Sequence, residues 1–194
     1  MEKAKLQVIF PGIGYHYDKP LLYYGRDVAY RAGFEEVINI SYSAPLTNIR
    51  GDREKMEKTF ESMYQQAEEN LKDVNWDSYS EVLFISKSIG TVIAASYAKN
   101  HGLSNVRHIL YTPLKDTVLA FEGVKEIDAI AFIGSADPWS NVPEVIDLAA
   151  QNNIPLHVYE GVNHSLESKD TLADLDIMKD VMSKSMDFSL RGNS

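Results

Sequence analysis

The sequence predicts an α/β fold, a three-layer sandwich in which about six mostly parallel strands carry helices on both faces. Short apolar runs recur along the chain, and each is followed by a loop and a helix-like pattern. Most of these runs are continuously apolar, as expected for parallel strands covered on both faces. The predicted strands are residues 6–10, 36–40, 82–85, 108–111, 129–133 and 156–159.

Two apolar stripes between the strands recur at helical spacing and predict helices that pack on the sheet. The first stripe contains Met56, Phe60, Met63, Ala67 and Leu71, and the second contains Leu172, Leu175, Met178 and Met182. A further helix is predicted over residues 20–32, with Gly33 at its end because glycine favours the C-terminal cap position. No repeat or linker interrupts this pattern, so residues 1–194 are expected to form a single domain.

Composition excludes several classes of function. A net charge of −9 disfavours binding to nucleic acids and anionic membranes. The absence of cysteine excludes disulfides, thiolate metal sites and a cysteine nucleophile. The N-terminal residues lack a signal-peptide pattern and no apolar stretch is long enough to span a bilayer, so a cytoplasmic protein is expected.

A tight turn between the strand at 82–85 and a helix of small residues contains a candidate nucleophile. The turn reads Ser86-Lys87-Ser88-Ile89-Gly90. A nucleophilic serine on such a turn has a strained backbone, so the residues two before and two after it must be small. Ser86 and Gly90 meet that requirement around Ser88, whereas the Lys87 side chain is expected to point to solvent.

A serine nucleophile requires a histidine to accept its proton and a carboxylate to orient that histidine. Asp137 follows the strand at 129–133, and His164 follows the strand at 156–159. Both therefore lie past the carboxyl ends of strands, as Ser88 does, at the edge where parallel sheets place their chemistry. The other histidines lie within strands, in the first loop or at a helix end, and Asp116 is the alternative acid.

These motifs resemble those of the α/β-hydrolase superfamily, whose nucleophile turn is Gly-x-Ser-x-Gly and whose triad occurs in the order Ser, Asp, His. Ser86 replaces the first glycine of the turn, and the 27 residues from Asp137 to His164 are similar to the family's spacing. The resemblance extends from residue 6 to about 188. It implies a minimal α/β-hydrolase fold in which the two earliest strands of larger members are absent.

The loop after the first strand resembles the His-Gly-x-Gly loop of the same superfamily, with Pro11 in place of the histidine. The resemblance implies an oxyanion hole formed by the backbone N–H of Ile89 and that of Ile13 or Gly14. The predicted substrate pocket consists of Gly12, Tyr15, Tyr17, Tyr111 and Trp139. A dinucleotide-binding Gly-x-Gly-x-x-Gly motif fits this loop poorly, because Tyr17 occupies the third glycine position.

The resulting prediction is a serine hydrolase that cleaves a small acyl ester or thioester and needs neither a metal nor an organic cofactor. The short interval between Ser88 and Asp137 leaves little room for a cap, which favours an open site and small soluble substrates. Two alternatives remain at this point, an acyltransferase or peptidase with the same triad and a non-catalytic binding module on the same fold. The oligomeric state and the physiological substrate are left open.

Overall fold

The described residues form six strands, which all belong to one parallel sheet with the order β2-β1-β3-β4-β5-β6. The structure is a computed structural model that describes residues 3–43 and 49–191. Its strands are β1 (Lys5–Phe10), β2 (Glu36–Asn39), β3 (Glu81–Lys87), β4 (Val106–Tyr111), β5 (Asp128–Gly134) and β6 (Leu156–Tyr159). Each overlaps a predicted strand, which confirms the predicted fold class.

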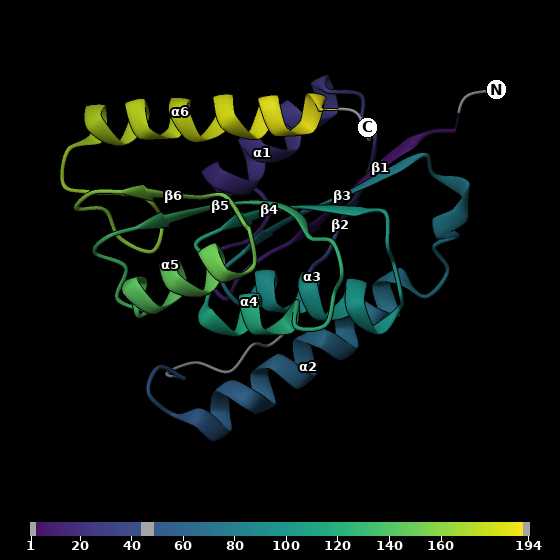
Figure 1. Ribbon diagram of the computed structural model, residues 1–194, viewed down its shortest axis with the longest axis horizontal. Helices are drawn as coiled ribbons and strands as arrows, with labels where there is room; N and C mark the ends of the chain where they lie inside the picture. The colour runs from purple at the N-terminus through teal and green to yellow at the C-terminus, as the bar shows by residue number, and fades with distance from the viewer. Residues whose placement is uncertain (1–2, 44–48, 192–194) are drawn as a thin grey trace.

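The helices form two layers around this sheet. They are α1 (Pro20–Arg31), α2 (Arg53–Leu71), α3 (Ile89–Asn100), α4 (Lys115–Ala120), α5 (Val142–Gln151) and α6 (Thr171–Leu190), with a 3-10 turn η1 (Trp76–Ser78) before β3. Figure 1 shows α1 and α6 on one face of the sheet and α2, α3, α4 and α5 on the other. Among the described residues, no helix has the length and apolar character needed to cross a membrane.

The central strand β3 explains why the apolar runs are continuous. All its residues are buried, and their side chains alternate between the two faces. Leu83 and Ile85 join the core under α1 and α6, whereas Val82 and Phe84 join the core under α2 and α3. This alternation decides the direction of every side chain at the end of β3, including those beside Ser88.

The second predicted apolar stripe, on α6, is exposed at its N-terminal end rather than buried. Leu172 and Leu175 are 74% and 59% exposed, whereas Met182 is buried and Met178 packs against the core. Figure 1 shows α1 beside the later turns of α6, with the first turns of α6 extending past it. The prediction that the whole stripe packs in the core is therefore wrong for its first two members, because none of the helices that the structure describes covers them.

Candidate active site

Ser88 lies between β3 and α3 in a strained backbone conformation, with φ 57° and ψ −128°. A positive φ is costly for a residue that has a Cβ, so the surrounding structure must hold it. The Ser88 N–H donates to the carbonyl of Tyr111 over 3.0 Å, and the Ser88 carbonyl accepts from the Thr91 N–H over 2.8 Å. These two hydrogen bonds hold Ser88 between β4 and the beginning of α3.

Close packing around this turn explains why its flanking residues are small. A Cβ added to Gly90 would lie 2.3 Å from the carbonyl oxygen of Phe10 and 2.5 Å from that of Pro11. Ser86 is fully buried, and its hydroxyl donates to the carbonyl of Ile109 over 3.3 Å. The turn therefore tolerates serine at the earlier position because that serine finds a hydrogen-bond acceptor.

The structure brings the three predicted triad residues into one hydrogen-bonded chain. His164 Nε2 lies 2.8 Å from Ser88 Oγ, and His164 Nδ1 lies 2.6 Å from Asp137 Oδ2. The other carboxylate oxygen of Asp137 accepts from the Trp139 N–H over 2.8 Å. Asp116, the alternative acid, is exposed in the first turn of α4, so the carboxylate that His164 meets is Asp137.

The surroundings of His164 favour its neutral form. Burial lowers the pKa of His164, the hydrogen bond that His164 donates to Asp137 acts in the opposite direction, and the nearby Lys87 charge lowers the pKa further. Because Asp137 accepts a hydrogen bond from the Nδ1–H group, the free electron pair of a neutral imidazole lies on Nε2. That atom faces Ser88 Oγ and can accept its proton.

The loop that presents His164 is held by polar contacts that the sequence motifs did not single out. Asn163 Oδ1 accepts from the N–H of Ser165 over 2.7 Å, and the Asn163 N–H donates to the carbonyl of Glu167 over 2.9 Å. Ser135 Oγ accepts from the Gly161 N–H over 2.8 Å, which joins this loop to the one that carries Asp137. The position of Asn163 directly before the histidine was the available signal, because asparagine favours such turns.

The first loop closes on itself and leaves the predicted oxyanion donors at its tip. The amides of Gly12 and Tyr15 bond to each other's carbonyls over 3.1 and 3.3 Å, so this closure does not use the amides of Ile13 and Gly14. Ile89 is the first residue of α3, where a backbone N–H has no acceptor within the helix. The tip of the first loop and the start of α3 therefore both carry backbone N–H groups at the predicted donor positions.

The predicted pocket residues lie in three different environments. Trp139 is 43% exposed, and its ring centroid lies 5.9 Å from that of His164. Gly12, Tyr15 and Tyr17 line a cavity of about 120 Å³ beside the first loop. Tyr111 is fully buried, and its hydroxyl shares a 3.0 Å hydrogen bond with Ser185 of α6. The pocket prediction is therefore wrong for Tyr111, because the alternation of β4 turns this ring into the core.

The expectation that Lys87 points to solvent is also wrong. Its side chain is on the same face of β3 as Leu83 and Ile85, under the first loop, and the residue is 2% exposed. Lys87 Nζ lies 4.8 Å from the centroid of the Tyr15 ring. A cation is thus buried one residue before Ser88.

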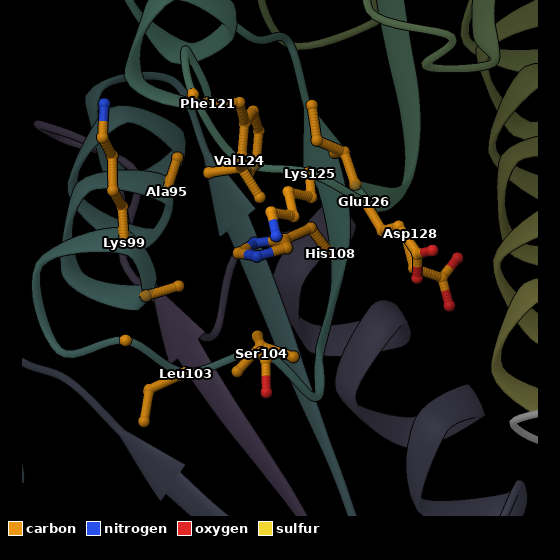
Figure 2. Close-up of a pocket in the computed structure, with 15 residues that line it drawn as sticks. Ala95, Lys99, Leu103, Ser104, His108, Phe121, Val124, Lys125, Glu126 and Asp128 are labelled. Carbon is orange, nitrogen blue, oxygen red and sulfur yellow. The ribbon is translucent and has the colours of Figure 1, made fainter.

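A larger cavity, of about 460 Å³, lies at the opposite edge of the sheet, next to the starts of β4 and β5. Figure 2 shows the imidazole of His108 within it, with Phe121 and Val124 among the lining residues. His108 is buried, and its Nδ1 has no hydrogen-bond partner among the described residues. This cavity contains none of the triad residues, and no group of three potential metal ligands occurs in the part of the chain that the structure describes.

Comparison with known proteins identifies the fold. No protein-family model and no curated protein sequence matches the chain. An α/β serine hydrolase homologue from Coxiella burnetii superposes with a TM-score of 0.63 at 13% identity, covering 95% of this chain and 86% of the other. An esterase from Pyrococcus furiosus gives 0.63 at 12% identity, covering 96% and 82%. An α/β serine hydrolase without a lid from Xanthomonas campestris gives 0.55 at 10% identity, covering 100% and 86%. The chain has the α/β-hydrolase fold.

Proposed function

We propose that this protein is a serine hydrolase that cleaves a small acyl ester or thioester. The observation that carries the proposal is the hydrogen-bonded chain from Ser88 through His164 to Asp137, built on a strained turn at the carboxyl end of β3. Such a constellation is recognised by its geometry and its roles rather than by sequence position. The similarity in fold to hydrolases and an esterase supports the same class.

Each part of the site has a role in the proposed reaction. Ser88 Oγ attacks the acyl carbonyl while His164 Nε2 accepts the hydroxyl proton, and Asp137 holds the imidazole and balances its charge. The amides of Ile89 and of Ile13 or Gly14 donate to the oxyanion of the tetrahedral intermediate. His164 returns the proton to the leaving alcohol or thiol, and an acyl-serine remains. Water then attacks this acyl-serine by the same route, which releases the acid and restores Ser88.

The shape of the site supports a short acyl chain. Ser88 is half-buried and Trp139 is exposed, so the site is open to solvent. The cavity of about 120 Å³ beside the first loop is lined by Ile13 and Gly14 and by none of the triad residues, so it offers room for a small group next to the proposed oxyanion donors. Small soluble esters and thioesters suit this space better than long lipid chains.

Labelling with a fluorophosphonate tests the nucleophile directly. We expect the wild type and Ser96→Ala to react, because Ser96 lies on α3 away from the triad, and we expect Ser88→Ala to remain unlabelled. A panel of short-chain nitrophenyl esters and thioesters should show turnover that disappears in His164→Ala. Equal labelling of wild type and Ser88→Ala, or no labelling of either, would contradict the proposal.

Acyl transfer to an acceptor other than water uses the same triad, so it needs a separate measurement. Product analysis in the presence of a competing alcohol or amine measures how the acyl-enzyme partitions. We expect free acid as the main product, because the exposed site admits water. A dominant transfer product would reassign the protein to the acyltransferases.

A further inference from the structure

Lys87 is the most unusual charged residue near the triad. Its stem runs against the first loop, where a Cβ added to Gly12 would lie 3.4 Å from Lys87 Cδ. Its ammonium lies over the Tyr15 ring, 4.8 Å from the centroid. Among the residues that the structure describes, no carboxylate oxygen lies within the 4.0 Å of an ion pair with Nζ. The charge is therefore stabilised mainly by an aromatic face and by more distant groups.

A second buried cation in the same sheet shows what a structural role looks like. Arg107 is also 2% exposed, but its guanidinium pairs with Glu81 over 3.3 Å and with Asp128 over 3.1 Å. A buried charge without such a partner is costly. A methionine would fill the space of Lys87 without that cost, so packing alone does not account for a lysine beside Ser88.

Among the described residues, five titratable groups on neighbouring elements lie close enough to Lys87 to matter for its charge. They are Tyr15 after β1, Tyr111 of β4, Asp137 after β5, and His164 and Glu167 after β6. Burial lowers the pKa of Lys87 to about 7, and Asp137 and Glu167 act in the opposite direction. Burial raises the pKa of Tyr15 to about 12 and that of Tyr111 above its ordinary value, so both phenols stay neutral. Among these groups, His164 has its pKa lowered from the ordinary value, by burial and by the charge of Lys87.

We propose that Lys87 is a positioning residue that acts through His164, and that its ammonium keeps the imidazole in the unprotonated, proton-accepting form. The inference rests on the proposed function. A second positive charge on His164 is disfavoured while Lys87 is charged, because Lys87 is buried and the His164 side chain is only 14% exposed, so little solvent screens the two charges from each other. The imidazole consequently serves as a base at a lower pH than an exposed histidine does.

The acidic limb of the pH profile of kcat/KM tests this proposal. In Lys87→Met the limb should move to higher pH by about one unit, which corresponds to a roughly tenfold loss of activity on the acidic side and little change at alkaline pH. Lys87→Arg keeps a charge and should restore the wild-type limb. Lys179→Met removes an exposed lysine of α6 and should leave the profile unchanged. A purely structural role for Lys87 would instead lower activity equally at all pH values.

A titration of the His164 imidazole by NMR provides a readout that does not need turnover. We expect the midpoint of His164 to rise in Lys87→Met and in Lys87→Gln, and to stay at its wild-type value in Lys179→Met. Equal midpoints in wild type and both Lys87 variants would overturn the inference while leaving the proposed function intact. Absence of labelling and turnover in the wild type would instead contradict the proposed function, and the NMR titration would still decide the role of Lys87.

Discussion

Replacing Lys87 with methionine should make the protein more stable, and by an amount that depends on pH. The folded protein holds the pKa of Lys87 at about 7, whereas a lysine in the unfolded chain titrates near 10.5. Between these values the unfolded chain carries a proton that the folded protein lacks, so wild-type stability decreases as pH falls from about 10.5 to about 7. Below about pH 7, Lys87 is protonated in both the folded and the unfolded state, and the loss of wild-type stability remains constant.

The structure sets the magnitude of this effect. The difference between 10.5 and about 7, at about 1.36 kcal/mol for each pKa unit, gives a ceiling of about 5 kcal/mol for the gain in free energy of unfolding. We expect roughly half of that ceiling, because the effective dielectric constant around buried charges in proteins is about 20 rather than that of a dry interior. The gain should be full at about pH 7 and below, and should vanish toward about pH 10.5.

Urea unfolding of the wild type, Lys87→Met and Lys179→Met across this pH range measures the effect. Comparison at each pH cancels the groups that all three proteins share. The exposed Lys179 should give a difference within about 0.5 kcal/mol that does not change with pH. A Lys87→Met variant that is less stable than wild type at about pH 7, or whose gain grows toward alkaline pH, would refute the reasoning.

Three further predictions follow from single contacts. Gly90→Ala should lower the free energy of unfolding by about 3 kcal/mol in urea titrations, because its Cβ meets a backbone carbonyl at 2.3 Å; a neutral effect would mean that β1 and α3 can separate. Asp137→Asn should keep the bond from the Trp139 N–H but lower kcat in ester assays by about 10³–10⁴-fold, since the carboxylate no longer orients His164; unchanged kcat would assign the acid elsewhere. His108→Phe should shift acid unfolding, followed by circular dichroism, to lower pH. Burial holds the pKa of His108 at about 3, so the stability present above its ordinary 6.5 is lost as pH falls below that value; an unchanged midpoint would show that His108 does not limit acid stability.

The sequence predicted the strands well because each apolar run is buried on both faces. The run at 82–85 became Glu81–Lys87, which adds only residues at its ends. Ser88, Asp137 and His164 could be named for a related reason: the ends of parallel strands meet at one edge, so residues that follow different strands come together. In the structure, His164 Nε2 lies 2.8 Å from Ser88 Oγ and His164 Nδ1 lies 2.6 Å from Asp137 Oδ2.

The features that sequence reasoning missed depend on contacts between distant segments. The sequence predicts Tyr111 as a pocket residue, but it packs against α6, which lies about 70 residues later in the chain. Leu172 and Leu175 have helical spacing, yet spacing does not reveal whether another helix covers that part of α6.

The sequence by itself thus determined the parallel α/β architecture, the turn at Ser88 and the identity of the residues that meet at the carboxyl edge of the sheet, because local periodicity and the order of the strands are sufficient for them. Only the tertiary structure decided the environment of those residues. Lys87 comes after the apolar run at 82–85, where a lysine is expected to point to solvent, but it is the last residue of β3, the first loop folds over it and the ring of Tyr15 covers its ammonium. The burial of Lys87, and with it the lowered pKa of its ammonium, results from segments that meet only when the sheet has formed.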